Sequence, residues 1–214
     1  MQSKIKTKAM IKESNTEEKI KNAARKLFQQ KGYAGTRTRD IAEAAGINLA
    51  LLNYYFRSKE RLFHLIMEGS LKDLFASIQS IMNDPTSSLS EKIDDIVNFY
   101  IDLLLTNANI PLFVLSEIQN QPEVMFSQIG LPKQFLSQTI LFKQVKEQIK
   151  LIGKEGINPL HFLINILSMT IFPFIAKPLI KRVVQINDED FKLFIEERRF
   201  LLPQLIKAML QLNN

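Results

Sequence analysis

The sequence contains no cysteine and only seven glycines among its 214 residues. The absence of cysteine excludes disulfide bonds, thiolate metal sites and a cysteine nucleophile, and it is typical of a reducing compartment. None of the glycines falls in a phosphate-cradling pattern. The first residues, MQSKIKTKAMIKES, lack the apolar core of a signal peptide. We therefore expect a cytoplasmic protein.

Side chains that carry catalysis are also scarce. The two histidines, His64 and His161, lie far apart in the sequence, each among apolar residues, where a histidine more often belongs to the core than to an active site. Asp94, Asp95 and Asp102 fall on one predicted helix, but the first and the last are about two helical turns apart. An enzyme is therefore the less favoured interpretation, and we expect no catalytic residue, no metal ligand and no cofactor.

Long hydrophobic runs are absent as well. The most apolar stretch, LHFLINILSMTIFPFIA from Leu160 to Ala176, is interrupted by histidine, asparagine, serine, threonine and proline. A membrane-spanning helix needs about 20 predominantly apolar residues, so this stretch predicts a buried helix, and we expect no membrane partner. Hydrophobic residues make up 46% of the chain, which is enough for a substantial core.

Positive charge is concentrated at one end of the chain. Residues 1–62 hold 14 Lys and Arg against 6 Asp and Glu, a net charge of +8, whereas the rest hold 14 against 16, a net charge of −2. A basic region joined to a mildly acidic remainder is typical of a phosphate-binding module, because contacts to phosphates release counterions and supply affinity. The alternative is a solvated lysine-rich tail that precedes a plain helical domain.

The apolar residues recur at helical spacing, and no stretch predicts a strand. We expect helices to begin at Asn15 or Thr16, at Arg37 or Thr38, at Asn48 and at Ser58. Gly32 and Gly46 are the expected ends of the first two. The later helices are predicted at 90–106, 110–120, 122–130, 133–153, 159–179 and 188–212, and Pro173 and Pro203 should kink or interrupt the last two.

Two short helices joined by the turn AAGIN form a helix-turn-helix pattern. The second helix, within GINLALLNYYFRSKE, is apolar or aromatic on nearly every side and ends in a basic turn. A recognition helix buries one face in its own domain while the other enters the major groove of DNA. Leu52 and Phe56 would serve the core, and Arg57 and Lys59 would meet phosphates. An ordinary core hairpin explains the apolar positions equally well, but it does not explain the local positive charge.

The segment AARKLFQQKGYAGTRTRDIAEAAGINLALLNYYFRSKERLF, Ala23 to Phe63, resembles the DNA-binding domain of the TetR (tetracycline repressor) family of bacterial transcription regulators. The resemblance implies an all-α fold. An N-terminal helix-turn-helix DNA-binding domain at 14–74, with its motif at 37–56, would precede a C-terminal helical domain at 75–214 for effector binding and dimerisation. It also implies a homodimer on double-stranded DNA and an unidentified small-molecule effector.

The family's DNA contacts carry over to eleven positions of this sequence: Arg37, Thr38, Arg39, Asn48, Leu49, Ala50, Leu51, Asn53, Tyr54, Tyr55 and Lys59. Arg39 would approach a base edge, and Lys59 would grip a phosphate. Many relatives have tyrosine where this chain has Asn53 and a polar or basic residue where it has Leu49. Asparagine can bind adenine through two hydrogen bonds and leucine can pack on a thymine methyl group, so we expect half-sites that contain A·T pairs.

The C-terminal part is rich in apolar side chains beyond the needs of one small core. Because members of the TetR family usually pair their last two helices in the dimer, the resemblance implies a dimer surface that comprises Ile164, Leu167, Ile171, Phe194, Phe200, Leu201, Leu205 and Met209. The candidates for an effector pocket are Phe99, Leu103, Phe113, Met125, Phe126, Ile129, Phe135, Phe142 and Phe162. This second set lacks partners for a buried charge, so it predicts a largely apolar effector.

These observations predict a DNA-binding transcriptional regulator that represses from an inverted-repeat operator until an apolar effector releases it. The alternative is a helical interaction module, or a small-molecule-binding protein, without specific DNA binding.

Overall fold

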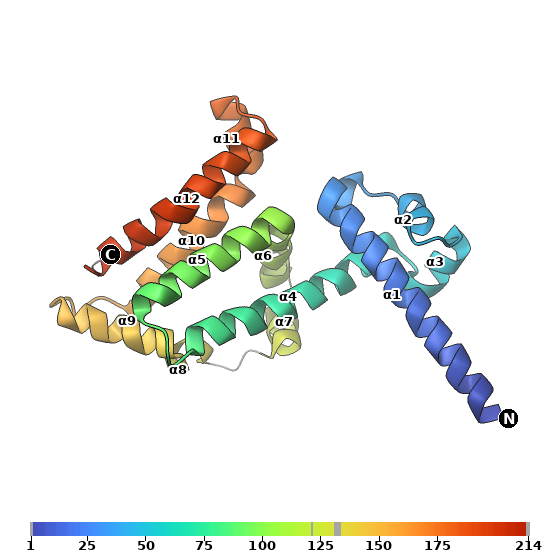
Figure 1. Cartoon of the computed structure of the whole chain (residues 1–214), viewed down its shortest axis with the longest axis horizontal. Coiled ribbons are helices and arrows are strands. Elements are labelled where there is room, and N and C mark those ends of the chain that lie inside the picture. Colours follow the sequence, from blue (N-terminus) through green and yellow to red (C-terminus); the bar gives the residue numbers. More distant parts are fainter. Residues whose placement is uncertain (1, 121, 131–133, 213–214) are drawn as a thin grey trace. The chain divides into compact units, whose positions relative to one another are not determined.

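The computed structural model describes residues 2–120, 122–130 and 134–212; the side chains of residues 2–14 and of Val124, Phe126, Gln128 and Ile129 lie outside the described part. Every regular element in these ranges is an α-helix (Figure 1), which confirms the predicted all-α fold class. The chain divides into two compact units, residues 1–70 and 71–214.

The first unit contains three helices and the start of a fourth: α1 (Gln2–Gly35), α2 (Thr38–Ala44), α3 (Leu49–Phe56) and α4 (Lys59–Asn83). Their apolar faces meet in one core, because the buried residues follow the helical spacing expected from the sequence. The core comprises Ile20, Ala24, Phe28, Ile41, Ala42, Leu52, Phe56, Leu62 and Ile66.

The predicted start of the first helix is wrong. The helix α1 begins at Gln2, well before the expected caps at Asn15 and Thr16. Gly32 does interrupt the helical backbone, with φ 68° and ψ 174°, as its freedom at positive φ allows. The last turn nevertheless continues to Gly35, and the buried Thr36 hydroxyl lies 2.8 Å from the Gly32 carbonyl oxygen.

The second unit contains the rest of α4 and the following helices: α5 (Leu89–Thr106), α6 (Ile110–Asn120), α7 (Pro122–Ile129), α8 (Phe135–Gln138), α9 (Ile140–Leu151), α10 (Pro159–Ile175), α11 (Lys177–Val184) and α12 (Asp188–Met209). The helix α5 lies at the centre of this unit: it packs along α12 and also contacts α9 and α10 (Figure 1). Its buried face carries Ile93, Val97, Ile101 and Leu104.

Two predicted helices of this unit are each divided in the structure. The stretch 133–153 breaks at Thr139, whose hydroxyl accepts a hydrogen bond from the Phe142 amide and starts α9. The stretch 159–179 breaks at Ala176, where the chain bends by 65°. Pro173 and Pro203 were expected to kink or interrupt their helices, yet both lie inside α10 and α12, which continue past them.

Polar side chains fix the ends of α5 and its contact with α12. Lys92 is fully buried, and its ammonium donates to the carbonyls of Asp84 (2.7 Å) and Ser87 (2.6 Å) in the preceding loop, and to the Ser87 hydroxyl (2.9 Å). Further along α5, Asp94 forms an ion pair with Lys207 of α12 at 2.8 Å. A second carboxylate, Asp102, forms an ion pair with Arg199 of α12 at 2.6 Å. These two carboxylates therefore join two helices.

No single helix in the described ranges is long and apolar enough to cross a membrane. The pairs α5–α6 and α10–α11 reach the required length and hydropathy only when joined, across bends of 97° and 65°.

Candidate functional site

The turn between α2 and α3 is built by backbone hydrogen bonds and one side-chain cap. Gly46 has φ 66°, and the next amide, that of Ile47, donates to the Ala42 carbonyl at 3.0 Å. Asn48 then caps α3, because its side-chain oxygen accepts a hydrogen bond from the Leu51 amide at 2.8 Å. The predicted caps at Asn48 and Ser58 are both confirmed, the latter by its hydrogen bond from the Arg61 amide.

The helix α3 has a buried side and an outward side. Leu52 and Phe56 are buried in the first unit. Ala50, Leu51 and Asn53 are exposed, and Tyr54 is exposed over 75% of its surface. A capped helix with this division is able to lay its free side in a groove of DNA.

Basic and hydroxyl side chains lie at the start of α2. Arg37 and Arg39 are exposed, and Thr38, which lies between them in the sequence, is half-buried. Asp40, the one acidic residue of the first turn of α2, forms an ion pair with Lys31 at 3.3 Å. Of the eleven residues predicted to contact DNA, none is buried: Arg37, Arg39, Asn48, Ala50, Leu51, Asn53 and Tyr54 are exposed, and Thr38, Leu49, Tyr55 and Lys59 are half-buried.

Lys59 has partners that the sequence prediction did not include. Its ammonium donates to the backbone carbonyls of Tyr33 at 2.9 Å and Thr36 at 3.0 Å. The same ammonium lies over the Tyr33 ring, 4.1 Å from the centroid. Lys59 therefore joins the start of α4 to the end of α1. An ammonium has three donors, so one N–H remains for a phosphate.

The second unit contains an apolar cavity of about 240 Å³. Its walls come from α4, α5, α8, α9 and α10, so the cavity depends on segments that are distant in sequence. The described residues that line it are Phe75, Ile78, Met82, Ile96, Tyr100, Phe135, Leu136, Leu141, Leu163, Ile166 and Leu167.

Of the seven predicted pocket residues whose side chains the structure describes, one, Phe135, lines this cavity. Three others, Phe113, Met125 and Phe162, are buried at other places in the second unit. A further three, Phe99, Leu103 and Phe142, are half-buried. Phe126 and Ile129 were also predicted, but their side chains lie outside the described residues. Sequence reasoning missed Tyr100, and the signal that could have found it is its place on the buried face of α5.

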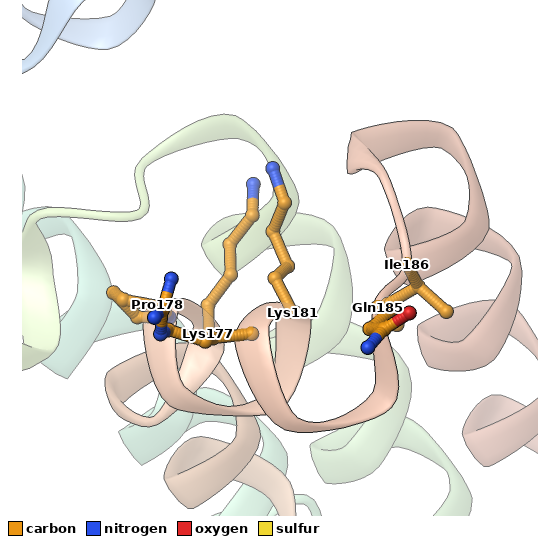
Figure 2. Close-up of a pocket in the computed structure, with 6 residues that line it drawn as sticks. Lys177, Pro178, Lys181, Gln185 and Ile186 are labelled. Carbon is orange, nitrogen blue, oxygen red and sulfur yellow. The ribbon is translucent and has the colours of Figure 1, made fainter.

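A wider depression of about 750 Å³ lies beside α11. Figure 2 shows the side chains of Lys177 and Lys181 extending from α11 in the same direction. Both ammonium groups pair with the Asp188 carboxylate, at 2.7 and 2.8 Å. These pairs lower the pKa of Asp188 to about 2, mainly through the hydrogen bond from Lys177. The lysines therefore connect α11 to α12. Among the described residues there is no group of three or more acidic or histidine side chains that could hold a metal ion.

The capped, outward-facing α3 and the basic start of α2 define the first unit as a helix-turn-helix DNA-binding domain. Residues 20–66 match the family model described as bacterial regulatory proteins, tetR family. Over 209 residues, 91% of this chain and 95% of the other, the sequence is 27% identical to the protein of Bacillus subtilis (strain 168) named Probable HTH-type transcriptional regulator YttP.

A second relative is the HTH-type transcriptional repressor NicS of Pseudomonas putida, 33% identical over 89 residues, which are 40% of this chain and 42% of that one. Among solved structures, the transcriptional regulator FadR from Bacillus subtilis in complex with stearoyl-CoA has a similar fold, with a TM-score of 0.54 at 17% identity over 88% of this chain and 96% of that one. Residues 20–66 are therefore similar to the DNA-binding segment of tetR-family proteins, and both of these sequence relatives are named as transcriptional regulators, not as enzymes.

Proposed function

We propose that this protein is a repressor that binds an inverted-repeat operator as a homodimer and leaves it when a small apolar molecule binds the second unit. The observation that carries the DNA-binding part is the division of α3, with Leu52 and Phe56 in the core and an exposed side that includes Asn53 and Tyr54. Repression is supported by NicS, a relative that is named as a repressor.

The exposed side chains divide into those suited to read bases and those suited to hold phosphates. Arg39 can donate two hydrogen bonds to guanine, and Asn53 can pair with adenine. Leu51 has no donor or acceptor, but it is exposed beside them and can pack on a thymine methyl group. Lys59 can contact the phosphates of the DNA backbone but not the bases, because its ammonium is held at the end of α1.

The homodimer is supported by an apolar surface on α10 and α12, which contact each other. Of the eight residues predicted for it, Ile171 and Phe194 are half-buried and the other six are exposed: Ile164, Leu167, Phe200, Leu201, Leu205 and Met209. Large apolar side chains exposed on two helices that contact each other are typical of a protein interface. Two-fold pairing would also present two recognition helices to two half-sites.

Release by an effector is supported by the walls of the cavity. The helix α4 contributes Phe75, Ile78 and Met82 to the cavity, and the same helix begins at Lys59 in the DNA-binding unit. The helix α10 lines the cavity with Leu163 and carries part of the apolar surface. A ligand that favours one position of these helices over another would change the affinity for DNA. The FadR structure holds stearoyl-CoA, so a related fold accommodates a ligand with a long hydrocarbon chain.

The test begins with selection of bound fragments from random duplex DNA by the purified protein. We expect an inverted repeat whose half-site centres are about 34 Å apart or a multiple of that distance. Arg39→Ala and Asn53→Ala should then each cost roughly 1–3 kcal/mol on the selected operator and relax the preference at particular base pairs.

The control is Arg25→Ala, which removes an exposed arginine of α1 in the same unit. It should change the affinities for operator and scrambled duplex by the same factor. If Arg39→Ala and Asn53→Ala also lowered both affinities equally, these residues would not read bases. If no inverted repeat were enriched, the proposed operator would be wrong.

A further inference from the structure

Among the described residues that line the apolar cavity of the second unit, one side chain has a hydroxyl or N–H group. Of the eleven described residues that line it, ten are aliphatic, phenylalanine or methionine, and the eleventh is Tyr100 of α5. None of these eleven is charged. A charged ligand would lose its hydration here without gaining a partner of opposite charge, so the lining disfavours it.

Tyr100 is a mostly buried residue of α5. The residue is exposed over only 8% of its surface, and its ring packs edge to face on Phe99 at 5.8 Å. Its hydroxyl makes no hydrogen bond to any residue that the structure describes. Burial raises the pKa of Tyr100 to about 12, so the phenol keeps its proton at neutral pH. The O–H group therefore remains a donor that an oxygen of a ligand in the cavity can accept from.

The volume indicates the size of the part of a ligand that the cavity can surround. A cavity of about 150 Å³ lined by apolar side chains holds one benzene molecule, and this cavity measures about 240 Å³. In proportion, it accommodates roughly ten non-hydrogen atoms.

We infer that the cavity binds an uncharged, mainly hydrocarbon molecule of roughly this size that accepts one hydrogen bond from the Tyr100 hydroxyl, such as a ketone, an ester or an ether. The inference rests on the proposed function only in treating this ligand as the effector. Binding itself is measured without DNA.

The test uses the full chain and three probes of similar size: butyrophenone, a neutral ketone; n-butylbenzene, which lacks an acceptor; and 3-phenylpropanoate, a carboxylate. Dissociation constants are measured by calorimetry or equilibrium dialysis for the natural protein and for Tyr100→Phe. Because ketone and hydrocarbon differ in hydration, the informative quantity is the ratio of their affinities. Tyr100→Phe should lower that ratio by roughly 3- to 10-fold, the value of one hydrogen bond.

Tyr33→Phe, which removes a tyrosine hydroxyl from the first unit, should leave the ratio unchanged. Leu163→Trp, which fills the cavity, should abolish binding of both neutral probes, and its melting curve checks that it folds. Tyr100→Phe loses no hydrogen bond to a described residue and is expected to fold normally.

The inference is overturned if Tyr100→Phe leaves the ratio unchanged, if the carboxylate binds as tightly as the ketone, or if neither neutral probe binds up to its solubility limit. A separate measurement with operator DNA tests the proposed function. If butyrophenone binds through Tyr100 but operator affinity stays the same, the ligand class stands and the release mechanism fails.

Discussion

Replacing Lys59 by methionine removes its ammonium and keeps most of its stem. The lost contacts are the hydrogen bonds to the carbonyls of Tyr33 and Thr36, at 2.9 and 3.0 Å, and the ammonium's position over the Tyr33 ring. The side chain is half-buried, so we take about 1 kcal/mol for each hydrogen bond and about 0.5–1 kcal/mol for the ring contact. The free energy of unfolding should fall by roughly 2–3 kcal/mol.

Urea unfolding followed by circular dichroism measures this loss. The matched control is Lys72→Met, which changes an exposed lysine of the same helix and should shift the free energy of unfolding by no more than about 0.5 kcal/mol. If Lys59→Met were as stable as this control, the contacts to the end of α1 would contribute nothing, and the interpretation of Lys59 as a brace would be refuted.

The same variant tests the contact between Lys59 and DNA. One N–H of the ammonium is left for a phosphate, so Lys59→Met should reduce the slope of log affinity against log salt by about one, equally on operator and scrambled duplex. Lys59→Arg keeps the charge and should preserve the slope. An unchanged slope in a destabilised Lys59→Met protein would leave Lys59 with the structural role alone.

Three further predictions concern the second unit. Lys92→Met leaves the oxygens of Asp84 and Ser87 without their buried cation and should lower the free energy of unfolding by about 2–4 kcal/mol in urea; an unaltered midpoint would contradict this. Phe200→Glu places a charge on a side chain of α12 that is 71% exposed, so light scattering should give half the mass of the natural protein; a dimer mass would shift the interface elsewhere. The pKa of Asp188 is about 2 in the folded protein, below its ordinary 3.8, so its ion pairs stabilise above the ordinary value and are lost as the pH falls through about 2. The melting temperature of Asp188→Asn should therefore be lower than that of the natural protein at neutral pH and equal to it in strong acid. If the difference in melting temperature were the same at every pH, the carboxylate would not be its cause.

Local features of this fold were predictable from sequence, because they depend on a few neighbouring residues. Asn48 and Ser58 cap the helices that follow them as expected, and Gly46 has the positive φ that the turn between α2 and α3 requires. The break at Ala176 was not predicted, because the proline rule pointed to Pro173, which α10 accommodates.

The cavity was less predictable, since it is a gap between helices and not a property of any one of them. The prediction selected apolar residues by composition, six phenylalanines among nine, and of the seven with described side chains only Phe135 lines the cavity. The lining brings together residues from distant segments, such as Phe75 and Leu167. Helical periodicity shows which face of a helix is buried, but not which other helix that face contacts. Lys59 is a similar case: its position in the motif suggested a phosphate contact, but a bond to the carbonyl of Tyr33, distant in sequence, has no local signal.

The tyrosines described above can serve as intrinsic spectroscopic probes of this protein. There is no tryptophan, and the four tyrosines lie at the proposed sites: Tyr54 and Tyr55 on α3, Tyr33 beneath the Lys59 ammonium, and Tyr100 in the cavity. Near-ultraviolet absorption and emission of the unmodified protein therefore arise mainly from these four rings. The Tyr100→Phe protein would emit from the DNA-binding unit alone, and subtracting its spectrum from that of the natural chain would isolate the cavity without any attached dye.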